Sequence, residues 1–233
     1  MTVCGIPIRI NTSWGFIAVF MAWSRGRGYF PEDLPGFAPL VYWLMGAAAA
    51  LLLFVCVLLH ELGHALIARR CGIPVVGITL FMFGGVAQLG SDPKRPRVEL
   101  MVALAGPLVS AAIAGICFFV SSRVAAHGAF QIVGIAIVRY LAMINLGLLL
   151  FNLLPGFPLD GGRLLRAALW AWSGNLQRAT RIASAIGGGF GVGLLLLGVW
   201  AILRGGWATG MWYVLLGFFL RNAALSSYRH ASR

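Results

Sequence analysis

Long apolar runs, separated by short turns rich in basic residues, glycine and proline, make up most of the chain. A helix needs about 20 apolar residues to cross a bilayer, and four of the runs have about that length. Two runs, one at each end of the sequence, are shorter. The six runs cover residues 10–23, 40–68, 99–122, 130–151, 182–203 and 207–220. This pattern predicts an all-α polytopic membrane protein with about six transmembrane helices.

Residues 75–89, which read VVGITLFMFGGVAQL, break this pattern. The segment is rich in β-branched and aromatic residues and is interrupted by Gly84 and Gly85, so it is too short and irregular for a spanning helix. A small membrane-embedded β-hairpin or re-entrant loop fits better, because such backbone persists at membrane depth only where it packs on protein or lines a cavity. An exposed strand edge there could pair with an unwound substrate. The alternative is a plain interfacial loop.

The remaining segments are predicted to be connections within a single domain, residues 1–233. Residues 1–9 form a short lead. Residues 24–39 contain several glycines and prolines, which predict a loop. No small-x-small cleavage site follows the first apolar run, so we interpret that run as a retained span and not as a removed signal peptide.

Composition supports a membrane protein and excludes a soluble globular domain, since 60% of residues are hydrophobic, 10% are charged and the mean hydropathy is +0.90. The formal net charge of +12 does not indicate nucleic-acid binding, because the basic residues lie in turns between apolar runs. The four cysteines, at positions 4, 56, 71 and 117, show no metal-ligand spacing. We interpret them as small buried apolar residues.

The distribution of basic residues predicts the orientation of the chain. With the N-terminus inside, thirteen of the 18 basic residues fall on one side, in segments 1–9, 69–98, 163–181 and 221–233. The other five, Arg139 among them, are assigned to the opposite loops. This excess predicts cytoplasmic termini, including a tail at 221–233.

Candidate chemistry lies near the end of the second run, in the sequence His60-Glu61-Leu62-Gly63-His64. Positions four apart share one face of a helix, so both imidazoles can hold the same zinc ion, with Glu61 beside them. Catalytic zinc takes three protein ligands and leaves one position for water, whose proton a neighbouring carboxylate removes. A glutamate inside a spanning helix costs about 3 kcal/mol, which makes it a candidate functional residue.

The fourth run ends at a break that supplies further candidates. Residues 152–162 read NLLPGFPLDGG, and their prolines and glycines interrupt any continuous helix. Broken membrane helices often mark a site. Asp160 is therefore the predicted third metal ligand. Asn152 is either a hydrogen-bond donor to the substrate or oxyanion, or a packing residue between helices.

The HELGH sequence on a membrane helix, followed by NLLPGFPLDGG, resembles the site-2 protease family of intramembrane zinc metalloproteases. The resemblance also covers GIPI at 5–8, FGGVA at 83–87 and AGPLVS at 105–110. It implies one zinc ion per chain, with His60, His64 and Asp160 as ligands and Glu61 as the general base. It also matches Asn152 to the asparagine that the family places before its LDG sequence.

The resemblance further implies the substrate and the setting. Members hydrolyse a peptide bond inside a substrate's transmembrane helix, commonly after a first protease has trimmed it. The chain is most similar to the compact prokaryotic branch, which implies a multi-pass protein of the cell membrane acting on single-span substrates. No CBS pair or PDZ insertion is found in these residues. The predicted substrate-binding residues are Phe83, Gly84, Gly85 and Val86.

Two other functions remain open from the residues, a membrane metal transporter and a helix-binding scaffold without protease activity. A transporter predicts further ionisable residues along a path through the membrane. A scaffold predicts loss of one of the four residues that carry the chemistry, and the sequence has all four: His60, Glu61, His64 and Asp160.

Overall fold

The computed structural model of the chain describes residues 2–82, 84–125 and 128–231. The chain forms two compact units. The first unit comprises Met1–Asp92 and Ala105–Leu149, and the second comprises Pro93–Leu104 and Leu150–Arg233.

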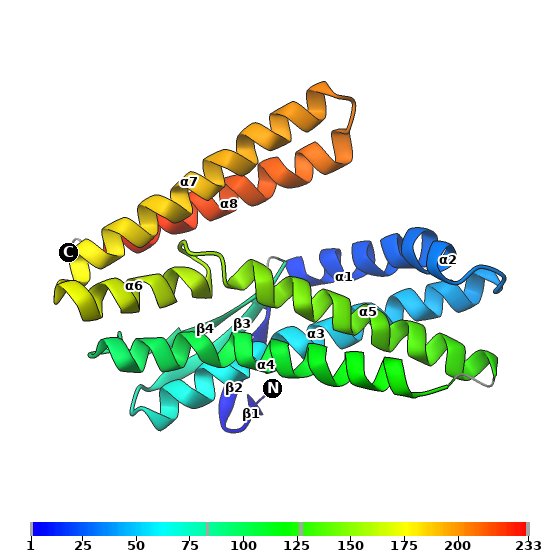
Figure 1. Cartoon of the computed structure of the whole chain (residues 1–233), viewed down its shortest axis with the longest axis horizontal. Coiled ribbons are helices and arrows are strands. Elements are labelled where there is room, and N and C mark those ends of the chain that lie inside the picture. The colour runs from blue at the N-terminus through cyan, green and yellow to red at the C-terminus, as the bar shows by residue number, and fades with distance from the viewer. Residues whose placement is uncertain (1, 83, 126–127, 232–233) are drawn as a thin grey trace. The chain divides into compact units, whose positions relative to one another are not determined.

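A four-stranded sheet lies in the first unit, with strand order β1-β2-β3-β4 (Figure 1). Its strands are β1 (Thr2–Val3), β2 (Ile6–Ile10), β3 (Val75–Phe81) and β4 (Gly84–Leu89). Strands β3 and β4 are antiparallel, which confirms the predicted hairpin and leaves β4 at the edge of the sheet.

The N-terminal lead is part of this sheet, which the sequence analysis missed. Strand β2 runs parallel to β3, with Ile8 opposite Ile78. Ile6 and Ile8 are buried, and this alternation was a readable strand signal. The chain turns between β1 and β2 through Cys4 and Gly5, both at positive φ. Cys4 is exposed, so the prediction of a buried apolar role was wrong for this cysteine.

Residues 24–39 also differ from their prediction as a loop. The helix α1 (Ser13–Ser24) continues through a π-helical turn, η1 (Arg25–Tyr29), into α2 (Phe30–Asp33). Close packing on α3 (Pro39–Arg70) explains this, because a Cβ built on Gly46 would lie only 3.0 Å from the backbone nitrogen of Gly26. Phe30 is fully buried in a cluster with Tyr42, Met45 and Tyr140. This burial outweighs the low helix propensity of the glycines.

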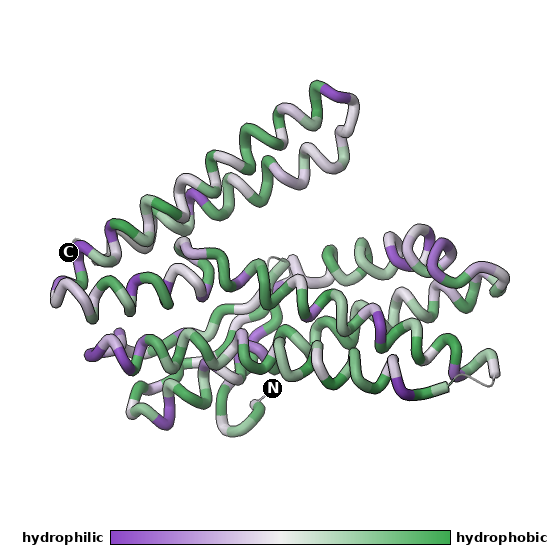
Figure 2. Tube along the Cα trace, viewed as in Figure 1, coloured by the Kyte–Doolittle hydropathy of each residue, from purple (hydrophilic) through white to green (hydrophobic). Residues whose placement is uncertain are grey.

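Within the described residues, four helices are long and apolar enough to cross a membrane: α3, α4 (Pro96–Arg123), α5 (Ala129–Asn152) and α7 (Leu176–Leu203). Figure 2 shows mainly apolar residues along them and polar residues gathered near their ends. The chain is therefore a multi-pass membrane protein, and six spans stay a prediction. Arg139 lies inside α5, so its assignment to a loop was wrong. Without Arg139, thirteen basic residues still fall in the segments predicted to be cytoplasmic and four fall in the opposite ones. The predicted orientation is therefore unchanged.

The second unit contains α6 (Asp160–Ser173) and an antiparallel hairpin of α7 and α8 (Trp207–Ala231) (Figure 1). Only some of the α7 glycines serve helix packing. A Cβ on Gly191 would lie 2.9 Å from backbone atoms of α8, whereas one on Gly189 or Gly193 would meet no atom of the described chain within 4 Å. Part of the glycine-rich surface of α7 is therefore not used against α8.

Candidate metal centre

Two histidines on α3 face the same way, as their spacing predicted. The Nε2 atoms of His60 and His64 lie 3.2 Å apart, and their ring centroids are 4.9 Å apart. Both residues are 3% exposed. The helix thus presents two imidazole nitrogens side by side within the protein.

A serine on α4 orients the first of these histidines. Ser110 Oγ is 2.9 Å from His60 Nδ1, and Ser110 is fully buried. In the tautomer with its proton on Nδ1, His60 donates to Ser110 Oγ and presents the lone pair of Nε2 to a metal. No role for Ser110 was predictable from its own stretch of sequence. The only signal was its place at the end of AGPLVS.

A glycine leaves the space in front of the two nitrogens. A Cβ built on Gly106 would lie 2.6 Å from His60 Nε2 and still closer to His64 Nε2. Space for an ion therefore exists in front of the two nitrogens because glycine at position 106 has no side chain. Two ligands about 2.0–2.1 Å from one tetrahedral zinc ion lie about 3.3 Å apart. The observed Nε2–Nε2 separation of 3.2 Å therefore fits zinc.

Replacing Ser110 by alanine is expected to weaken zinc binding by about 10- to 100-fold, because His60 loses the partner that fixes its tautomer and ring orientation. Competition with a chromophoric chelator measures this affinity. Ser121→Ala is the matched control, since that exposed hydroxyl on the same helix donates only to the carbonyl of Phe118. Equal affinities of the two variants would exclude the orienting role.

The carboxylate of Glu61 lies between α3 and the hairpin. Glu61 is 8% exposed, and its Oε2 accepts a hydrogen bond from the Ala87 N–H at 3.1 Å. A Cβ on Gly85 would lie 2.9 Å from Glu61 Cδ, so glycine allows β4 to approach the carboxylate. The edge strand of the sheet therefore runs directly beside the predicted general base.

Of the other predicted substrate-binding residues, Gly84 and Val86 lie on either side of Gly85 in β4. Gly84 begins β4 at a φ of +132°, a conformation that favours glycine. Val86 is 46% exposed. Phe83 lies outside the described residues.

The break between α5 and α6 is confirmed in the second unit. Asn152 ends α5 and Asp160 begins α6. A Cβ on Gly161 would lie 2.5 Å from the backbone carbon of Leu153, so the start of α6 packs tightly on the preceding turn. The potential metal ligands of the described chain are thus a histidine pair in one unit and Asp160 in the other.

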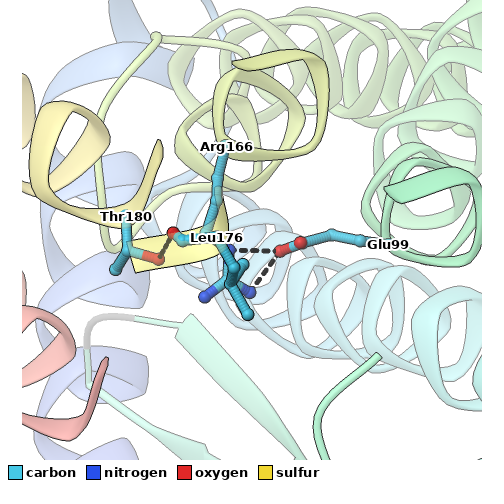
Figure 3. A network of polar contacts seen from close by, with 4 residues as sticks. All are labelled: Glu99, Arg166, Leu176 and Thr180. Carbon is cyan, nitrogen blue, oxygen red and sulfur yellow. Dashed lines mark hydrogen bonds and ion pairs between the residues drawn. The ribbon is translucent and has the colours of Figure 1, made fainter. Parts of the chain in front are cut away.

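A buried ion pair ties α6 to the beginning of α4 within the second unit (Figure 3). Arg166 Nε donates to Glu99 Oε1 at 2.6 Å, and a second guanidinium nitrogen donates to the same oxygen. The guanidinium also lies over the ring of Phe157, 5.0 Å from its centroid. Glu99 is fully buried. These contacts fix α6 at Arg166, six residues beyond Asp160.

The chain matches one protein-family model and is similar to several known proteins. The family described as Peptidase family M50 matches residues 48–133 and 123–195. A protein of Synechocystis sp. named "Putative zinc metalloprotease sll0528" is 42% identical over 229 residues, which are 97% of this chain and 58% of that protein. Zinc metalloprotease MJ0392 of Methanocaldococcus jannaschii is 40% identical over 197 residues, 84% of this chain and 52% of that protein. The chain spans somewhat more than half the length of these relatives.

A solved structure is similar over nearly the whole chain. It is described as Site-2 Protease from Methanocaldococcus jannaschii and is 29% identical, with a TM-score of 0.66. The match covers 98% of this chain and 93% of that one.

Proposed function

Because the chain belongs to peptidase family M50, the site-2 protease family, we propose that it is an intramembrane endopeptidase that hydrolyses a peptide bond within the transmembrane segment of its substrate. Relatives are named zinc metalloproteases, which supports a zinc-dependent reaction. The observation that carries the proposal is the buried pair of His60 and His64 on a membrane helix, with Glu61 beside an edge strand.

We propose that one zinc ion is held by His60 and His64, whose Nε2 atoms lie 3.2 Å apart, together with Asp160. When bound, zinc acts as a Lewis acid toward water and the scissile carbonyl. The cradle at Gly106 and the spacing of the histidine nitrogens support this site.

The side chains of the protein move the protons. Glu61 takes a proton from the attacking water as the water oxygen bonds to the scissile carbonyl carbon. As the C–N bond breaks, Glu61 passes that proton to the leaving amine. Asn152 donates a hydrogen bond to the oxyanion. The burial of Glu61 keeps bulk water away from this transfer.

The substrate is proposed to bind as an extended strand beside β4. Helical amides are shielded by their own hydrogen bonds, so the substrate helix must unwind first. Backbone groups alternate along a strand, and the Ala87 N–H points away from β3 toward Glu61. The Ala87 N–H is taken by Glu61, so the outward carbonyl oxygens of Gly85 and Ala87 offer the pairing positions near the general base, flanked in sequence by Gly84, Val86 and Phe83.

The proposed setting is the cell membrane, with single-span membrane proteins as substrates. Helices α1 and α8 would complete six spans, and both termini would lie in the cytoplasm. The bias of basic residues toward the segments on that side supports this orientation.

Removal and return of zinc tests the proposal. Purified protein should cleave a single-span model substrate, lose this activity when a chelator removes the metal, and regain it at about one zinc ion per chain. Mass spectrometry of the products should place the cut within the apolar span. Cleavage that survives metal removal would contradict a zinc protease. A cut confined to the polar flanks would contradict an intramembrane one.

A further inference from the structure

A small cavity in the first unit lies between α1, α3 and the tip of the β3–β4 hairpin. Its volume is about 80 Å³. That is several times the roughly 10–15 Å³ that one water molecule needs, and much less than the roughly 300 Å³ or more of a small-molecule site. The space therefore has the size of one amino-acid side chain. The lining includes Ala18 and Met21 of α1, Ala50 and Val57 of α3, and Met82 and Gly84 of the hairpin.

The cavity lies next to the proposed general base, on the same face of α3. Phe54 and Val57 line it, and with Glu61 they follow one another at spacings of three and four residues, so the three form one stripe along the helix. Val57 is about 6 Å from Glu61 along the axis at 1.5 Å per residue. On the hairpin, Gly84 lines the cavity and the next residue, Gly85, approaches Glu61. A peptide bond held at Glu61 therefore has this cavity beside it.

Contacts of α1 bound the cavity at both ends. The Met82 N–H donates to Ser13 Oγ at 3.3 Å, which joins the start of α1 to the tip of the hairpin (Figure 1). The ring of Trp14 packs edge-on against that of Phe54, with the centroids 4.4 Å apart. Further along, a Cβ on Gly46 would overlap the backbone of α1, so the two helices touch there. The cavity is thus a space preformed between two helices that are held together.

The lining suits an apolar side chain. No charged residue and no histidine is among the described residues that line the cavity. A polar group buried there without a hydrogen bond would be unfavourable, and an ionised group more so. Ala18 and Ala50 leave the room, one from each helix. Met21 and Met82 are flexible, so the walls can adjust to the shape of the bound group.

Building on the proposed function, we propose that this cavity is the pocket that receives a branched aliphatic side chain of the substrate, that of a residue next to the scissile bond. Successive side chains of a strand alternate between two faces, so a substrate strand beside β4 can direct one of them toward α1 and α3. The cavity extends from Val57 toward Ala50, so this residue lies on the side of the scissile bond that faces the start of α3. The pocket lets the enzyme select among unwound transmembrane sequences.

Matched substrates test the pocket. The cut in a single-span substrate is mapped by mass spectrometry, and each of the two residues on either side of it is replaced by alanine, leucine, phenylalanine or aspartate. At one position, the zinc-loaded protein should cleave the leucine form with a kcat/KM about 10- to 100-fold above that of the alanine form, because three more carbons are buried. Both residues favour helices, so unwinding does not account for this difference. The phenylalanine and aspartate forms should be cleaved at least about tenfold more slowly than the leucine form.

Variants of the lining locate the preference. Ala50→Leu and Ala18→Leu each fill the cavity from one helix. Each should lower kcat/KM for the leucine form by at least about tenfold and leave the alanine form close to the wild-type value. Ala47→Leu, at an exposed position of α3, is the matched control and should keep the wild-type preference. Met21→Ala enlarges the cavity and should raise cleavage of the phenylalanine form relative to the leucine form.

The alanine form and Met21→Ala separate specificity from folding, because a misfolded variant loses every substrate and gains none. Rates within about threefold at all four positions would overturn the pocket and leave the protease reaction in place. An unchanged leucine preference in both filled variants would place the selection elsewhere and also overturn it. Equal loss of all substrates in the filled variants, with no gain in Met21→Ala, would assign the cavity to helix packing alone. A wild-type protein that cleaves no single-span substrate would overturn the proposed function and this inference together.

Discussion

Replacement of Glu61 by glutamine is expected to slow peptide-bond cleavage by about 10²- to 10⁴-fold, while the protein keeps its zinc and its fold. Glutamine has nearly the size of glutamate, and its side-chain oxygen can still accept the hydrogen bond from the Ala87 N–H. It cannot take a proton from water. The rate of cleavage of a single-span substrate, measured with zinc content and melting temperature, checks this expectation.

An exposed carboxylate provides the control for this substitution. Glu32 lies on α2, and Glu32→Gln should cleave at close to the wild-type rate. Wild-type activity in Glu61→Gln would exclude Glu61 as the general base. Loss of zinc together with activity in that variant would assign Glu61 to metal binding instead.

The sequence predicted the parts of the site that depend on short spacings. Residues four apart share a helix face, so the pairing of His60 with His64 followed from HELGH alone. The prolines and glycines after Asn152 predicted the break that precedes Asp160, because both residue types are unfavourable inside a helix. The glycine pair in residues 75–89 likewise predicted the hairpin.

Contacts between distant residues were not predictable, because they depend on how whole helices pack. Ser110 reaches His60 across 50 positions of sequence, and nothing local to either residue indicates the other. The glycines that allow close approach, Gly85 and Gly106, read as ordinary small residues until the neighbouring side chains are placed. Strand β2 had a readable alternation, but it is short and gains its stability from pairing with β3.

Among these contacts between residues far apart in the sequence, the ion pair of Glu99 with Arg166 has the largest expected effect on stability. Replacing Glu99 by alanine is expected to destabilise the protein by about 3–5 kcal/mol, because a largely buried guanidinium loses its partner. For a chain of this length, such a loss lowers the melting temperature by on the order of 10 °C. The side chain of Arg166 is only 15% exposed and that of Glu99 1%, so water cannot replace the lost contact. Apparent melting temperatures in detergent at a fixed scan rate measure the effect.

Removing both charges distinguishes the ion pair from simple packing. The double variant Glu99→Leu with Arg166→Leu should recover most of the stability lost in Glu99→Ala, since neither charge is then buried alone. Arg163→Ala, three residues earlier on α6, is the control for loss of an arginine and should melt close to wild type. A Glu99→Ala variant as stable as the wild type would show that the ion pair contributes nothing.

The ion pair of Glu99 with Arg166 is also expected to affect zinc binding, because it lies on the helix that carries the proposed ligand Asp160. Arg166 and Asp160 lie on the same short helix, and the ion pair fixes that helix to the start of α4. Loss of Glu99 should therefore weaken zinc binding even at temperatures where the protein stays folded, because the carboxylate of Asp160 is then held less firmly. The double variant should recover zinc affinity along with stability. Wild-type zinc affinity in a destabilised Glu99→Ala would restrict the pair to a structural role and leave the placement of Asp160 to the packing of Gly161 on the turn at Leu153.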